Sequence, residues 1–209
     1  MYWDYDADAP DGVLRKTVFE GLGLRMESGR ISRASGSRLK NLKVQKPVFS
    51  VLAFFSADFD PAHISFAHEA NHWLAEAGKQ FNFRYDSTKN WNLLNDPAYL
   101  QKYQVVLFLD NTPPASVRRG FERYMKAGGG FIGFHVSAFN DQKHIWDLYY
   151  DDFLGCGLYK GNTWRPTRAI LKVDQPTHPV TRYLPPLFES APNEWYKWEH
   201  NLRNNPEIQ

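Results

Sequence analysis

The sequence predicts an α/β fold built around a mostly parallel central sheet, and three observations lead to this prediction. Unbroken apolar runs at residues 48–56, 104–110 and 130–135 are typical of strands covered on both faces. Segments with helical spacing of apolar residues, at 64–77 and 115–127, lie between these runs. Strands that alternate with helices of this length favour right-handed crossovers and parallel pairing. We therefore expect the three runs to be the innermost strands of one sheet.

The predicted elements follow one another in a regular order. VFSVLAFFS (48–56) passes through the loop ADFDPAH into the first helix. FNFRYDS (81–87) alternates apolar and polar residues, as a less buried strand does. QVVLFLD (104–110) precedes the second helix, which three consecutive glycines (128–130) end before the strand GFIGFH. The first half of the fold is thus a repeated strand and helix pattern.

The ends of the chain differ from this central part. RAILKV (168–173) predicts a further strand of the same sheet, whereas 177–186 and 191–198 are rich in proline and aromatic residues and predict structured loops. Residues 1–46 end in a basic stretch with interspersed serine and glycine, which is typical of a solvated extension or linker and less often of an arm that binds a polyanion. The predicted domain therefore spans 47–209.

Composition bounds the function. The formal net charge is only +2, so we expect neither a nucleic acid nor a membrane as partner, and no apolar run approaches the roughly 20 residues that cross a bilayer. The single cysteine, Cys156, excludes an intramolecular disulfide and a cysteine-based metal cluster. The N-terminus has no apolar signal core, so we expect a cytoplasmic location, or a periplasmic one if a signal was removed.

HEANH (68–72) matches the H-E-x-x-H zinc signature literally. In that signature two histidines one turn apart bind the metal, and the glutamate acts as general base. The apolar arc of this helix, however, faces almost opposite to His68 and His72, and no third ligand follows at a familiar spacing. We therefore expect these histidines to face solvent and predict no metal site, with a zinc hydrolase as the third hypothesis.

Polar side chains follow the predicted strands at the edge where ligands bind in parallel α/β folds. His135 ends one strand, with Ser137 and Asn140 just beyond it. Imidazole exchanges protons near neutral pH, which suits a general acid or base. The sequence also places these candidate residues in the other loops of that edge: His63, Ser65, Asp110, Asn111 and Thr112. Their alternative role is to cap helices and form turns.

NEWYKWEH (193–200) surrounds one carboxylate with aromatic side chains. Such a composition suits a sugar ring that stacks on an aromatic face while Glu194 binds its hydroxyl groups. Trp195 and Tyr196 are then candidate stacking residues. Ordinary packing of aromatic side chains under a long loop explains the pattern equally well.

Several segments together resemble one family. The segments are HIS (63–65), YQVVLFLDNTPP (103–114), FERYMKAGGGFIGFHVSAF (121–139), HPVTRYLP (178–185) and NEWY (193–196). They resemble the ThuA-like family, named for trehalose utilisation, over roughly residues 48–209. The resemblance implies the flavodoxin-like three-layer sandwich of class I glutamine amidotransferases and a role in carbohydrate catabolism that includes 3-keto sugars. The family's C-terminal strands do not follow here, so we expect the ThuA-like domain of 47–209 to lack them.

The resemblance also implies what His135 replaces. In the related amidotransferases the elbow reads G-x-C-x-G with a nucleophilic cysteine, and the matching residues here are Gly133 to Ser137, with His135 at the cysteine position. Cys156 lies outside this elbow, so glutamine amidotransferase activity is not expected.

Two main hypotheses remain open from the sequence. In the first, the protein is an isomerase or hydrolase of a sugar or keto-sugar, in which His135 and His63 transfer protons and Glu194 binds or orients the substrate. In the second, it is a non-catalytic carbohydrate-binding or accessory module on an amidotransferase-like scaffold. Both predict a small sugar as partner and no cofactor, and both are compatible with a homo-oligomer.

Overall fold

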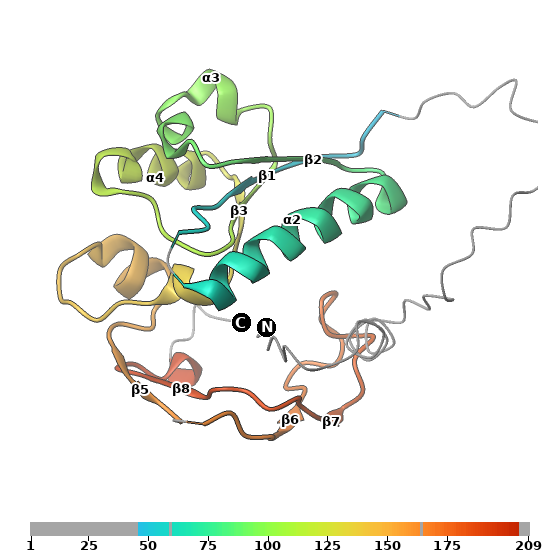
Figure 1. Cartoon of the computed structure of the whole chain (residues 1–209), viewed down its shortest axis with the longest axis vertical. Coiled ribbons are helices and arrows are strands. Elements are labelled where there is room, and N and C mark those ends of the chain that lie inside the picture. Colours follow the sequence, from blue (N-terminus) through green and yellow to red (C-terminus); the bar gives the residue numbers. More distant parts are fainter. Residues whose placement is uncertain (1–45, 59, 164, 205–209) are drawn as a thin grey trace, which may run out of the picture. The chain divides into compact units, whose positions relative to one another are not determined.

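The structure is a computed structural model that describes residues 46–58, 60–163 and 165–204 (Figure 1). Its contacts divide the described chain into a first unit, residues 46–161 and 196–204, and a second unit, residues 162–195. The extension predicted for residues 1–46 lies, apart from Lys46, outside the described residues.

The first unit is built on a parallel sheet with the strand order β2-β1-β3-β4. Its strands are β1 (Ser50–Phe54), β2 (Arg84–Thr88), β3 (Val105–Phe108) and β4 (Gly130–Gly133). β1 pairs in parallel with β2 and β3, and β3 pairs in parallel with β4. The predicted α/β architecture is therefore confirmed, and all these strands end at the same edge of the sheet.

Helices cover both faces of this sheet, so the unit is a three-layer sandwich (Figure 1). On one face, α2 (Pro61–Phe81) packs Phe66, Ala70 and Leu74 against buried side chains of β1 and β3. On the other face, Phe108 of β3 lies among aromatic side chains that include Phe121 of α4 (Arg118–Lys126). The described chain also contains the following short helical segments: η2 (Trp91–Asn95), α3 (Pro97–Leu100), η3 (Ala115–Val117), η4 (His135–Ala138), η5 (Leu148–Phe153) and η6 (Leu202–Asn204).

The apolar runs predicted β1 and β3 as buried strands correctly, but the same prediction was wrong for β4. Residues 51–54 and 106–108 are buried. In β4, which lies at an edge of the sheet, the Ile132 side chain is 52% exposed. Phe131 on the opposite face packs against Phe108 and Phe121. An apolar run cannot show that Ile132 is left outside the apolar cluster that α2 forms with buried side chains of β1 and β3.

The prediction that residues 168–173 extend the main sheet was also wrong. β6 (Ile170–Lys172) lies in the second unit and pairs antiparallel with β7 (Leu187–Glu189). The sequence predicted a loop around 191–198, but β8 (Tyr196–Trp198) forms a two-stranded sheet with β5 (Tyr159–Asn162). Short runs of three or four residues show a strand's tendency but not its partner, because the partner is set by tertiary contacts.

Candidate functional site

His135 lies at the end of β4, in a backbone conformation that few residues adopt. Its φ angle is +42°, in the left-handed region, which costs a non-glycine residue about 1–3 kcal/mol. Hydrogen bonds fix the turn on either side: Phe134 N donates to Phe108 O at 2.9 Å, and Ser137 N donates to Phe134 O at 2.9 Å. At Gly133 a Cβ atom would lie 2.5 Å from Ser137 Oγ and 3.0 Å from Phe131 Cζ, so a larger residue would require these side chains to shift. The tight turn holds the His135 side chain at the sheet edge.

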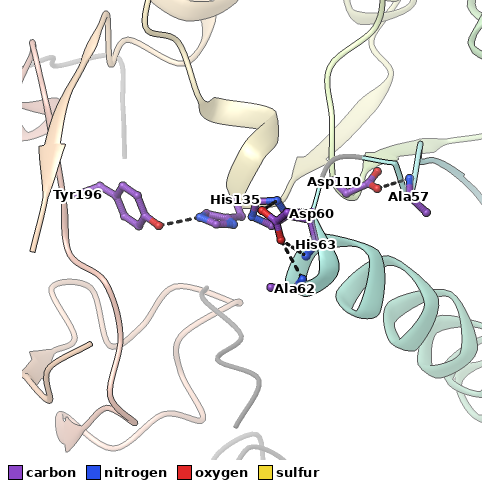
Figure 2. A network of polar contacts seen from close by, with 7 residues as sticks. All are labelled: Ala57, Asp60, Ala62, His63, Asp110, His135 and Tyr196. Atoms are coloured by element: carbon purple, nitrogen blue, oxygen red, sulfur yellow. Dashed lines mark hydrogen bonds and ion pairs between the residues drawn. The ribbon is translucent and has the colours of Figure 1, made fainter. Parts of the chain in front are cut away.

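Tyr196 fixes the far side of the His135 ring. Its hydroxyl oxygen lies 2.9 Å from His135 Nε2, and the rings meet edge to face with centroids 5.5 Å apart (Figure 2). Tyr196 begins β8, so a strand 61 residues further along the chain orients this histidine. The sequence predicted Tyr196 as a stacking residue, and this hydrogen bond is an additional contact that the aromatic pattern did not reveal.

His63 occupies the first turn of α2, beside the aspartate that caps this helix. Asp60 Oδ1 accepts hydrogen bonds from Ala62 N at 2.8 Å and from His63 N at 3.1 Å. Asp60 Oδ2 lies 2.8 Å from His63 Nδ1, and the His63 side chain is only 16% exposed (Figure 2). The sequence prediction missed Asp60, although Asp-Pro before a helical segment is an N-terminal signal. The same signal explains why α2 begins at Pro61 and not at the predicted residue 64.

The two histidine rings are neighbours. The centroids of His63 and His135 lie 4.9 Å apart, with an angle of 62° between the ring planes. The convergence of these residues, expected because parallel strands end at one edge, is therefore confirmed. The result is a row of proton-exchanging groups that runs from the Asp60 carboxylate through both imidazoles to the Tyr196 hydroxyl (Figure 2). Their roles in catalysis stay predictions.

The loop after β3 holds the edge of the sheet together. Asp110 is 2% exposed, and its carboxylate accepts a hydrogen bond from Ser56 N at 2.8 Å. It also accepts one from Ala57 N at 2.5 Å, which Figure 2 shows. Asn111 Nδ2 donates to Ser56 Oγ at 3.3 Å, and its Oδ1 accepts a hydrogen bond from Thr112 N at 2.8 Å. These contacts tie the end of β1 to the end of β3. Substrate binding by Asp110, Asn111 and Thr112 stays a prediction.

Ser137 and Asn140 are also buried and contribute to the local structure. Ser137 is 1% exposed and lies beside the Tyr149 phenol, whose pKa burial raises strongly while the serine hydroxyl opposes the rise. Asn140 is 6% exposed, and its backbone oxygen accepts a hydrogen bond from Tyr159 N at 2.7 Å. Ser65 is half-buried in α2. Their predicted contacts with a substrate are not tested by this geometry.

Glu194 and Trp195 belong to the second unit. There Trp195 N donates to Thr163 Oγ1 at 2.9 Å, and Trp195 Nε1 donates to the backbone oxygen of Thr167 at 3.0 Å. These bonds orient the indole within its own unit. A sugar-binding role for Glu194 and Trp195 stays a prediction.

An aromatic cluster that the sequence did not predict as a whole adjoins His135. Tyr159 of β5 contacts Phe139, Tyr196 and Trp198, with ring centroids 5.1, 5.9 and 5.9 Å apart. Phe139 is 41% exposed, whereas the other three rings are half-buried. The cluster joins the histidine pair through the Tyr196 hydroxyl. Partly exposed aromatic rings beside polar groups are typical of small-molecule sites.

The HEANH segment faces away from this site. His68, Glu69 and His72 are exposed on α2, as the helical spacing predicted, while Ala67 is buried. Asn71, the remaining polar residue, accepts a hydrogen bond from the Tyr85 hydroxyl at 2.8 Å. Among the side chains that the structure describes, no three His, Cys, Asp or Glu residues gather as a metal site would require.

Cys156 is buried, and burial raises the pKa of its thiol to about 11. A thiolate therefore forms only at a pH well above neutral, because the folded protein favours the uncharged thiol. We expect the native protein at pH 7.5 to resist a thiol reagent such as 5,5′-dithiobis(2-nitrobenzoate), and the unfolded protein to react at once. Rapid reaction of the native protein would contradict this account of the thiol.

The fold and the site together place this protein in the class of parallel α/β sandwiches in which a tight turn after a strand presents a histidine. The model of the ThuA family, described as trehalose utilisation, matches residues 51–208, and the chain belongs to this family. A ThuA-like protein from Bacteroides uniformis, of known crystal structure, is 32% identical, with a TM-score of 0.70 over 82% of this chain and 69% of that one.

A second ThuA-like crystal structure, from Parabacteroides merdae, is 17% identical, with a TM-score of 0.50 over 73% of this chain and 63% of that one. At this identity it supports the fold alone. Proteins with curated functions give no match. Within the described ranges, no helix combines the length and apolar character that crossing a bilayer requires.

Proposed function

We propose that this protein acts on a sugar or keto-sugar, of the trehalose or 3-keto-sugar kind, by proton transfer through His135 and His63. The observation that carries the proposal is the pair of imidazole rings, with centroids 4.9 Å apart at the carboxyl edge of the sheet. Membership of a family described as trehalose utilisation supports the substrate class. The strained φ angle of His135 supports a functional role, because such conformations concentrate at functional sites.

The reaction class follows from what two imidazoles can do. Isomerisation or bond cleavage beside a carbonyl needs a base that removes a proton from carbon and an acid that returns one. A neutral imidazole can accept the proton and an imidazolium can donate it, so the two rings divide these tasks at one substrate. The Tyr196 hydroxyl, 2.9 Å from His135 Nε2, extends the proton path to the aromatic cluster.

The aromatic cluster favours a sugar over a more polar metabolite. The faces of a sugar ring that carry only C–H groups pack against aromatic rings, and Phe139 exposes 41% of its surface beside Tyr159. The same cluster favours the alternative function, a non-catalytic carbohydrate-binding module. For a zinc hydrolase the exposed positions of His68 and His72 give no support.

The proposed partner is accordingly a small sugar, and not a nucleic acid or a membrane surface, because the chain carries a net charge of only +2. A homo-oligomer is compatible with this function. The location we propose is the cytoplasm, with the periplasm as the alternative.

A substrate screen tests the proposal. Trehalose, other disaccharides and their 3-keto forms are incubated with the protein, product formation is followed by NMR, and binding is measured by calorimetry. We expect conversion of at least one keto-sugar. Binding without conversion, retained when His63 and His135 are both changed to Gln, would instead support the binding module. If the protein neither bound nor converted any sugar, that result would contradict both functions.

A further inference from the structure

We infer that Asp60 is a positioning residue that fixes the tautomer of His63, with the proton on Nδ1 and the lone pair on Nε2. The carboxylate oxygen Oδ2 lies 2.8 Å from His63 Nδ1, and a carboxylate can only accept a proton. This assignment makes His63 Nε2 the proton acceptor of the pair. This assignment adds detail to the proposed function. Only its consequence for catalysis rests on that function; the tautomer itself does not.

Proximity is enough to set this preference. The contact is an ion pair by distance and lacks hydrogen-bond geometry, so the preference is electrostatic: a negative oxygen 2.8 Å from Nδ1 favours the tautomer that carries the proton on that nitrogen. The His63 side chain is 16% exposed and that of Asp60 is 40% exposed, so water screens the interaction in part from the carboxylate side. Without such a partner, a ring nitrogen's protonation state follows whatever bond the other nitrogen makes.

The helix cap holds the carboxylate in place. Asp60 Oδ1 accepts from the backbone N–H groups of Ala62 and His63, which leaves Oδ2 to face the ring. Pro61, at the first helical position, restricts the backbone directly after the cap. Asp60 and His63 are therefore positioned by the same turn of α2, three residues apart, and their geometry depends little on the rest of the fold.

His135 has a different partner, so the two imidazoles are not equivalent. Its Nε2 bonds a phenol hydroxyl, which can donate or accept and imposes no tautomer. A carboxylate beside one ring and a hydroxyl beside the other assigns the base to His63. His135 with Tyr196 is then the group that returns the proton.

Asp60→Asn is the sharpest test, because asparagine caps a helix as well as aspartate does. Its amide oxygen must remain on the N–H groups of Ala62 and His63, since the opposite orientation would set donors against donors. The amide NH₂ group then replaces Oδ2 and faces His63 Nδ1. The positive hydrogens of an amide in place of a negative oxygen reverse this electrostatic preference, so the variant should invert the tautomer of His63 without unfolding the helix.

The primary measurement is the ¹⁵N spectrum of the histidine rings, which distinguishes a protonated ring nitrogen from one with a lone pair. Spectra are recorded at a pH where the rings are neutral, and His63→Gln identifies the His63 signals. We expect Nδ1–H in the wild type and Nε2–H in Asp60→Asn. The melting temperature is measured in parallel, and Asp60→Ser, which keeps a capping oxygen but removes the group beside Nδ1, serves as a second variant.

Asp96→Asn is the matched control. Asp96 also caps a helix ahead of a proline, and its side chain accepts a hydrogen bond from Tyr99 N at 3.0 Å, but no histidine faces it. This variant should change neither the His63 spectrum nor turnover. Asp60→Asn should lower turnover by about 10²-fold or more, as expected when a catalytic histidine is held in the wrong tautomer.

The outcomes separate this inference from the proposed function. An Nε2–H tautomer in the wild type, or an unchanged tautomer in Asp60→Asn, would overturn the inference whatever the protein catalyses. An inverted tautomer with undiminished turnover would overturn the catalytic part. An inverted tautomer in a protein that converts no sugar would leave the positioning role of Asp60 in place and contradict the proposed function.

Discussion

Replacing His135 by glutamine is expected to lower turnover of the sugar substrate by about 10² to 10⁴-fold while the protein stays folded. The loss follows because an amide cannot exchange a proton with substrate carbon or oxygen. The fold should survive, since glutamine keeps one hydrogen-bonding group for Tyr196, and the weaker preference of glutamine for the left-handed backbone is matched in the control variant. Turnover is measured at saturating substrate, and circular dichroism confirms the fold.

His144→Gln is the matched control for this substitution. His144 also has a positive φ angle, +61°, but its side chain is 81% exposed and pairs with Asp147. Its replacement tests the same change of residue type in the same backbone conformation, at a histidine that pairs with Asp147 and not with Tyr196. We expect wild-type turnover from it. A loss of less than about tenfold in His135→Gln would show that another group transfers the proton.

Replacing His63 by glutamine is expected to cause a loss of similar size, and the double replacement of His63 and His135 little more. When two groups act as one unit, removing either group already removes most of their joint contribution to kcat. The losses of the two single variants therefore do not multiply in the double variant. The ring centroids lie 4.9 Å apart, well within the distance at which mutational effects couple. The measurement is kcat for both single variants and the double variant.

His72→Gln controls for the substitution in the same helix. His72 lies on the exposed side of α2 and should tolerate the change with unaltered kcat. If the two site variants instead multiplied their losses in the double variant, the imidazoles would act independently. That result would contradict a shared task at one substrate.

The sequence predicted the core of the fold well because burial on both faces leaves a direct record in residue type. Leu52 and Phe54 of β1 and Phe108 of β3 are fully buried, as their unbroken apolar runs indicated. The edge strand β4 has the same apolar character, yet Ile132 is half exposed. Whether a helix covers an edge strand depends on helix placement, which the strand's own residues do not encode.

The site was predictable in its histidines but not in their partners. Parallel strands end at one edge, so the loops that carry His63 and His135 had to converge there. The pairing of His135 with Tyr196 depends on β8, a strand of three residues that no periodicity reveals. Asp60 was overlooked because a capping aspartate has a sufficient structural role by itself, and its second contact appears only with the His63 ring in place.

Deuterium exchange at the substrate tests the central claim most directly. A keto-sugar that the protein binds is incubated with it in D₂O, and NMR follows the hydrogen on the carbon beside the carbonyl. Proton transfer through the histidine pair predicts that solvent deuterium enters this position faster with the wild-type protein than without protein, and that His63→Gln and His135→Gln abolish the difference. Exchange at the uncatalysed rate with the wild type, or undiminished exchange in both variants, would contradict it.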